Sequence, residues 1–221
     1  MVESDEEQLE QLKNWWDENG TSLVLTVVIA LGGVFGFRAW EANVQQTGEA
    51  ASAVYEDLVA AAENMEADED AMRATAQNLS ETLRSDFDSS TYAVFGALHM
   101  ARLAVDAGDL SKAQSELEWA LENVSEPRLE TMVRIRLARV LNASGDATAG
   151  LALLINYQPP EGQHVSFEEA RGDLYHALGD LNSARDAYQK AIGALAEGET
   201  RPVLELKLAD IPESPGEDEG A

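Results

Sequence analysis

The chain has 221 residues, with 41 Asp and Glu against 15 Lys and Arg, and a formal net charge of −26. This charge argues against nucleic acid as a partner, because binding to phosphates needs clustered Lys and Arg. The chain has no Cys, which excludes disulfides, Cys-ligated zinc and Cys nucleophiles. Its length allows one ordinary domain with appendages, and its many Ala and Leu residues favour helices.

An acidic segment, residues 1–20, precedes an apolar stretch at residues 21–40, TSLVLTVVIALGGVFGFRAW. No charged residue lies between Glu18 and Arg38, and a bilayer is crossed by about 20 apolar residues. Tryptophans stand on both sides of the stretch, as is typical where a helix ends at lipid headgroups. We therefore predict one transmembrane helix at 21–40, by which the protein is held in a membrane.

Two other interpretations of this stretch are a cleaved signal peptide and a buried core helix. A signal peptide would need a basic start and a small-residue cleavage site, but the start is acidic and Arg-Ala-Trp-Glu, at residues 38–41, is a poor cleavage site. Tryptophans at both ends argue against a core helix. A retained anchor is therefore favoured. Lys13 and Arg38 flank the uncharged residues 19–37, one on each side, so the charges predict no orientation.

Small residues inside the apolar stretch form a possible contact face for another membrane helix. Gly32 and Gly36 make a GxxxG pattern, with Gly33 beside them. Such residues let two helices approach closely, although the pattern is common by chance in apolar helices.

Residues 41–211 are predicted to form a helical domain, because apolar residues recur at helical spacing through most of it. An acidic break at residues 67–70 separates its first two predicted helices. The last residues, 212–221, read PESPGEDEGA and are predicted to be a disordered acidic tail.

Three Gly-Asp turns recur within this domain and indicate an internal repeat. They begin at Gly108, Gly145 and Gly179, and the second and third are 34 residues apart. Each turn follows one Ala- and Leu-rich helix and precedes another. A period of 34 residues with a helix–turn–helix unit resembles the tetratricopeptide repeat.

The third copy matches the small and large positions of this repeat best. Its matching residues are Gly172, Tyr175, Gly179, Ala184, Tyr188 and Ala191. The first copy has Leu117 where the repeat has an aromatic residue, and the second has Gly150 where Ala is usual. The segment NYQPPEGQH is expected to interrupt the stack, because Pro159 and Pro160 cannot continue a helix. The fold class predicted is all-α, a single transmembrane helix followed by a tetratricopeptide repeat (TPR)-like α-solenoid of helical hairpins.

The whole layout resembles the YfgM-like family, the ancillary SecYEG translocon subunits. The features that carry the resemblance are QLKNWWDENG before the span, the Gly-Gly pair in it, the Arg-x-Trp exit, and GDLYHALGDLNSARDAYQKAI in the last repeat. They extend over roughly residues 10–211. The acidic tail departs from the family pattern.

The resemblance implies a single-pass protein of the bacterial inner membrane, with a cytoplasmic N-terminus and a periplasmic C-terminal domain. It also implies association with SecYEG and with a membrane-anchored peptidyl-prolyl-isomerase-like chaperone. The function implied is that of an adapter that helps hand secreted proteins, including unfolded clients, to periplasmic chaperones. An alternative is a regulatory interaction protein that restrains an envelope-stress response regulator.

No pattern in the sequence indicates an enzyme, a cofactor or a metal site. The three histidines, His99, His164 and His176, are far apart, and neither a Walker loop nor GxSxG occurs. The acidic cluster at residues 66–70 lacks the Gly and the terminal Glu of a calcium loop.

Binding residues are instead expected in a groove lined by the first helix of each repeat. The repeat alignment places there Phe95, Leu98, Arg102, Val105, Met132, Ile135, Arg139, Asn142, Ser166, Glu169, Asp173 and His176. Arg102 and Arg139 occupy equivalent positions and could hold a carboxylate or an acidic peptide. Alternatively each pairs with a nearby Asp or Glu, which the sequence alone favours, and the apolar members belong to the core.

Overall fold

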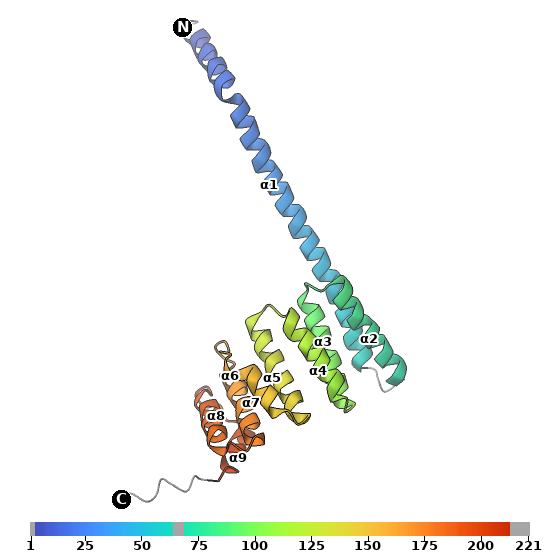
Figure 1. The fold of residues 1–221 in the computed structure, drawn as a ribbon. Helices are drawn as coiled ribbons and strands as arrows, with labels where there is room; N and C mark the ends of the chain where they lie inside the picture. The colour runs from blue at the N-terminus through green and yellow to red at the C-terminus, as the bar shows by residue number, and fades with distance from the viewer. Residues whose placement is uncertain (1–2, 64–68, 213–221) are drawn as a thin grey trace, which may run out of the picture. The chain divides into compact units, whose positions relative to one another are not determined.

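The computed structural model describes residues 3–63 and 69–212, and within these ranges the chain is helical without any strand (Figure 1). The all-α prediction is thus confirmed. Residues 213–221 of the predicted tail and most of the acidic cluster at 66–70 lie outside the described residues. The helices are α1 (Glu3–Glu63), α2 (Glu69–Asp86), α3 (Thr91–Asp106), α4 (Leu110–Asn123), α5 (Pro127–Ala143), α6 (Ala147–Ile155), α7 (His164–Ala177), α8 (Leu181–Gly193) and α9 (Pro202–Ala209).

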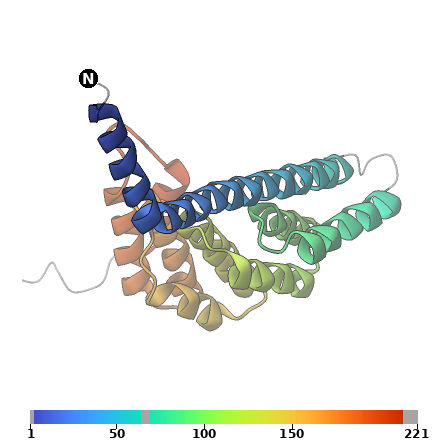
Figure 2. The same cartoon turned by 90° about the horizontal axis from the view of Figure 1, so that it is seen from above.

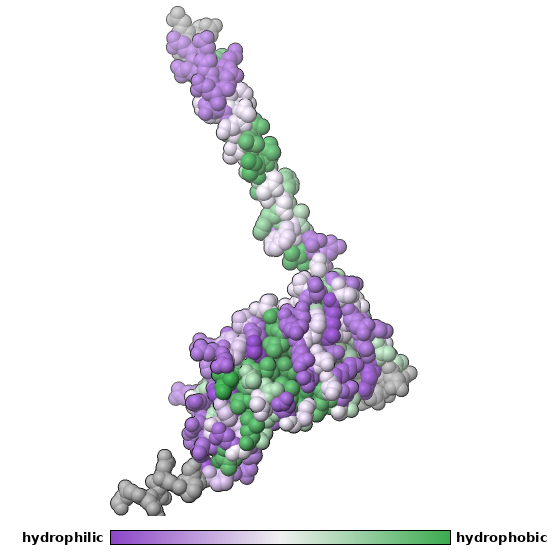
Figure 3. Space-filling view, viewed as in Figure 1, coloured by the Kyte–Doolittle hydropathy of each residue, from purple (hydrophilic) through white to green (hydrophobic). Residues whose placement is uncertain are grey.

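The chain divides into two units, residues 1–50 and 51–221, and the division lies inside α1. In the first unit, α1 carries the apolar stretch predicted at 21–40, seen as a mostly green and white part of the helix beyond its purple start in Figure 3. Its large apolar side chains are exposed, from 43% at Leu23 to 67% at Phe35. An 18-residue window here has a mean hydropathy of 2.0, so the helix is long and apolar enough to cross a membrane.

The second unit is a stack of helical hairpins (Figures 1 and 2). The end of α1, from Ala51, packs through Leu58 against Leu83 of α2 and Ala93 of α3. Further along, α3 pairs with α4, α5 with α6 and α7 with α8, and α9 packs on α8. Each hairpin contacts the next in chain order, which is the arrangement of an α-solenoid.

A Gly-Asp turn joins the two helices of each of the last three hairpins. In each turn the Gly ends the first helix and the Asp caps the second. Gly108, Gly145 and Gly179 have φ of 76°, 90° and 78°, a left-handed conformation that ends a helix and favours glycine. The Asp that follows accepts a hydrogen bond from the backbone N–H three residues on and so caps the next helix. These bonds are 3.0 Å to Lys112, 2.9 Å to Ala149 and 3.1 Å to Ser183.

Glycines inside helices mark where two helices approach most closely. A Cβ atom on Gly172 of α7 would lie 2.3 Å from the ring of Tyr188 in α8. A Cβ atom on Gly150 of α6 would lie 2.8 Å from the carbonyl oxygen of Ala138 in α5. This close approach of α6 to the α5 backbone explains why Gly150 stands where the repeat usually has Ala.

The proline-containing segment breaks a helix but leaves the stack continuous. Residues 156–163 join α6 to α7, and α7 packs against both α5 and α6. Tyr157 in this segment lies 3.0 Å from the hydroxyl of Thr131 and donates to the carbonyl of Pro127 at 3.2 Å. The expectation of an interrupted stack is thus wrong, because the loop is itself held on α5.

Candidate functional site

A cavity in the second unit lies between α3, α4 and α5. Its volume is about 380 Å³, and it is partly open to solvent. Most of its wall is apolar. The lining residues are Leu98, Ala101, Arg102, Val105, Leu110, Leu117, Arg136, Arg139, Val140 and Ala143.

A second cavity of about 210 Å³ adjoins the first. The two share Leu98, Arg102 and Arg136, so they form one continuous depression, which we call the α3–α5 groove. The second cavity adds the lining residues Tyr55, Phe95, His99 and Met132. The end of α1 thus contributes an aromatic side chain to a groove built mainly by α3 and α5.

Three arginines line this groove, and only one of them has an ion pair within the described part of the chain. Arg102 lies 3.6 Å from Asp106, and both side chains are well exposed, at 70% and 63%. Arg136 and Arg139 have no such partner within 4.0 Å among residues 3–63 and 69–212. Burial and the neighbouring charge of Arg139 lower the pKa of Arg136. Three guanidinium groups therefore lie close together here, and Arg139 also interacts electrostatically with Glu169 of α7.

His99 stands at the junction of α3 with the end of α1. Its Nε2 lies 3.0 Å from the hydroxyl of Tyr55, and the two rings meet edge to face. Burial lowers the pKa of His99, and the charges of Arg102 and Arg136 lower it further, against a smaller opposing effect of Glu63. The side chain packs in the groove wall. Among the described residues, no cluster of His, Asp and Glu is placed to hold a metal ion.

The structure brings together six of the residues expected to line a groove. The residues that line the α3–α5 groove are Phe95, Leu98, Arg102, Val105, Met132 and Arg139. Ile135 does not, because its side chain points into the core beside Phe167 and Leu174 and is only 6% exposed.

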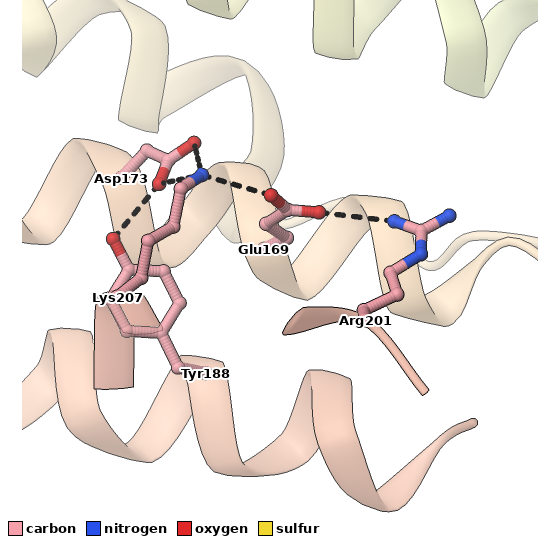
Figure 4. A network of polar contacts seen from close by, with 5 residues as sticks. All are labelled: Glu169, Asp173, Tyr188, Arg201 and Lys207. Atoms are coloured by element: carbon pink, nitrogen blue, oxygen red, sulfur yellow. Dashed lines mark hydrogen bonds and ion pairs between the residues drawn. The ribbon is translucent and has the colours of Figure 1, made fainter. Parts of the chain in front are cut away.

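In the third repeat, the expected groove residues Glu169 and Asp173 form ion pairs with the segment of α9 (Figure 4). Lys207 of α9 donates to Glu169 at 2.9 Å and to Asp173 at 2.7 Å, and Arg201 donates to Glu169 at 3.1 Å. Asp173 also accepts a hydrogen bond from the hydroxyl of Tyr188 at 2.8 Å, and burial raises the pKa of that hydroxyl. Asp173 is therefore engaged within the chain. His176 is exposed at the end of α7.

Two groove residues that the repeat alignment did not single out are Arg136 and His99. Arg136 lies four residues after Met132 and three before Arg139, so helical spacing alone could have placed it on the same face. His99 follows Leu98 and reaches the groove through its contact with Tyr55, which no local pattern in the sequence indicates.

The glycines predicted to pack against another membrane helix lie in the first unit. A Cβ atom added to Gly32, Gly33 or Gly36 would meet no other atom within 4 Å. Their role as a contact face stays a prediction.

Comparisons with known proteins extend over nearly the whole chain. The profile of the tetratricopeptide repeat-like domain family matches residues 13–213. Ancillary SecYEG translocon subunits of Haemophilus influenzae and Escherichia coli are 29% and 26% identical to it, over 85% and 96% of this chain and 88% and 98% of theirs. The subunit of Neisseria gonorrhoeae is 24% identical over 94% of this chain and 97% of its own length. No solved structure matches significantly.

These relatives confirm the resemblance of the sequence to the YfgM-like family. The helical hairpins, the three repeated turns and the profile match agree with one another. The chain therefore belongs to the tetratricopeptide repeat-like domain family.

Proposed function

We propose that this protein is a membrane-anchored adapter that associates with the SecYEG translocon and helps hand secreted proteins to periplasmic chaperones. One observation carries the proposal. An exposed apolar helix precedes a repeat unit with an open groove, in a chain similar along 96% of its length to a protein named ancillary SecYEG translocon subunit. A repeat groove of this kind suits the binding of protein segments.

The arrangement proposed in the membrane puts residues 1–20 in the cytoplasm and the helical unit in the periplasm. In that position the unit could meet both emerging clients and a membrane-anchored peptidyl-prolyl-isomerase-like chaperone. Binding is the only activity proposed, since arginines and apolar side chains make up most of the groove lining.

Photo-crosslinking in native membranes tests the association with the translocon. A photoreactive amino acid is placed at Ile29 in the apolar helix, at Val105 in the groove, and at Glu122 on the exposed side of α4 as a control. We expect adducts with a SecYEG subunit from Ile29 or Val105 and not from Glu122. Absence of such adducts from all three positions would overturn the proposal.

The orientation can be tested separately because the chain has no Cys. Single cysteines are introduced as Glu7→Cys and Asp210→Cys, and intact spheroplasts are treated with a membrane-impermeant maleimide. We expect labelling of the cysteine at 210 before lysis and of the cysteine at 7 only after lysis. The opposite pattern would place the helical unit in the cytoplasm.

A further inference from the structure

The α3–α5 groove gathers positive charge on a chain in which acids far outnumber bases. The chain has 15 Lys and Arg against 41 Asp and Glu, yet Arg102, Arg136 and Arg139 all line this one groove. Arg136 and Arg139 are three residues apart on α5 and share a face. Neither guanidinium group has an ion pair within 4.0 Å in the described chain, and Arg139 interacts with Glu169 only at longer range, so their donors are available to a ligand.

The wall between these arginines is apolar. Leu98 and Leu117 form its buried part, and Val105 stands 43% exposed at its edge. A ligand that only supplied a carboxylate would leave this surface in water, whereas a large apolar side chain entering the cavity would bury it. The cavity of about 380 Å³ has room for such a side chain.

We propose that the groove binds a peptide segment of a partner protein in which an acidic residue lies beside a large apolar one. The carboxylate pairs with Arg136 and Arg139, because guanidinium groups hold carboxylates with two hydrogen bonds. The apolar side chain enters the cavity beside Val105. This inference rests on the proposed function only in taking the ligand to be part of a protein.

Two other occupants fit the groove less well. The chain's own last residues, 213–221, supply carboxylates but no large apolar side chain. A lipid anion would need its long tail enclosed, whereas this groove is open to solvent and continues into a second cavity lined by Tyr55 and Phe95. An extended peptide can follow such a surface across several helices.

The experiment uses the full chain in detergent micelles and a phage library of random seven-residue peptides. We expect the selected peptides to share Asp or Glu next to Leu, Phe, Met or Trp. The most enriched peptide is then synthesised with a fluorescent label, and its affinity is measured by fluorescence polarisation. A second version, with each acid replaced by its amide, should bind at least about 10-fold more weakly, which corresponds to about 1.4 kcal/mol.

Variants of the protein locate the binding. Arg136→Glu and Arg139→Glu should each weaken binding at least about 10-fold, and Ala143→Trp should do so by filling the cavity. Arg128→Glu is the matched control, because it makes the same charge change at an exposed site of α5 outside the groove. We expect it to change the affinity less than about twofold at 150 mM salt, where distant charges are screened.

Several results would overturn the inference. They are the absence of enrichment, selected peptides without acids, and equal loss of binding in the Arg128 control. A chain that ends at Pro212 and binds at least about 10-fold more tightly would show that the tail occupies the groove. Displacement of the labelled peptide by myristate, with the fatty acid binding at least as tightly as the peptide, would assign the groove to a lipid anion. If crosslinking to SecYEG from Ile29 persists in any of these cases, the proposed association stands and only the peptide assignment fails.

Discussion

Single residues set how closely the helices of each repeat can approach. Gly172→Ala would place a methyl group 2.3 Å from the ring of Tyr188, which is 3% exposed and held by Asp173 through its hydroxyl. Because this ring cannot move freely, we expect the free energy of unfolding to fall by about 1–3 kcal/mol. Thermal unfolding of the full chain in detergent measures the change.

Gly193→Ala is the matched control for this prediction. Gly193 ends α8, and a Cβ atom there would meet nothing within 4 Å. Its replacement should raise the free energy of unfolding by about 0.5–1 kcal/mol, since Ala favours the helix. Equal effects at positions 172 and 193 would contradict the close packing of α7 on α8.

A second prediction at this scale concerns His99 and pH. Its pKa is lowered in the folded chain, first by burial and then by Arg102 and Arg136, so the unfolded chain binds a proton more readily. The stability that His99 contributes is therefore lost as the pH falls through 6.5, its ordinary pKa. Between pH 7.5 and 5.5 the melting temperature should fall more in the native chain than in His99→Gln. A steeper fall in the variant would refute the assignment.

At the scale of elements, the sequence predicted the hairpins well because each is specified locally. Gly145 and Asp146 are adjacent, and each alone favours the conformation it adopts, so the turn is readable without tertiary information. The burial of Ile135 was harder to predict, because its helix has apolar residues on more than one side. The docking of α9 was not predicted, since Lys207 and Asp173 are 34 residues apart and belong to no common repeat.

The ion pairs of α9 lead to a prediction about the end of the stack. Lys207→Met should leave the carboxylates of Glu169 and Asp173 partly buried with fewer donors, so α9 should detach more often. We expect faster amide exchange in Leu204 and its neighbours, with α3 to α5 unchanged. Lys190→Met, at an exposed site of α8, is the control. Equal exchange in both variants would mean that apolar packing alone holds α9.

The pH dependence of this docking follows from the same groups. Burial raises the pKa of Glu169, but the hydrogen bond and charge of Lys207 outweigh this effect and lower that pKa below 4.5. Bonds to the two carboxylates raise the pKa of Lys207 above 10.5, again against burial. The stabilisation by Glu169 is lost at acidic pH and that by Lys207 at alkaline pH. The protection of the α9 amides, meaning their exchange rate relative to the intrinsic rate at each pH, should therefore be greatest between these two values. A maximum of protection outside this window would contradict the ion pairs.

For the molecule as a whole, the prediction concerns the membrane anchor. Carbonate washing of membranes should leave the full-length chain in the pellet, because α1 exposes apolar side chains over a bilayer's length. Val28→Asp combined with Ile29→Asp should release it, since each acid at the centre of a span costs about 2.5–3.5 kcal/mol. Val203→Asp, at an exposed site of α9, is the control. Recovery of a shorter soluble product from the native chain would indicate a cleaved signal peptide instead.

The docking of α9 has a consequence for how such a chain can change in length during evolution. Each hairpin offers its neighbour a surface shaped for one more hairpin, but the last surface is already taken by a short helix bound through Lys207 and Leu204. A duplicated hairpin inserted directly before or after the α5–α6 hairpin would pack against a hairpin on each side. One added after α8 would have to displace α9. Gene duplications that lengthen the protein are therefore expected in the interior of the stack, with both ends kept.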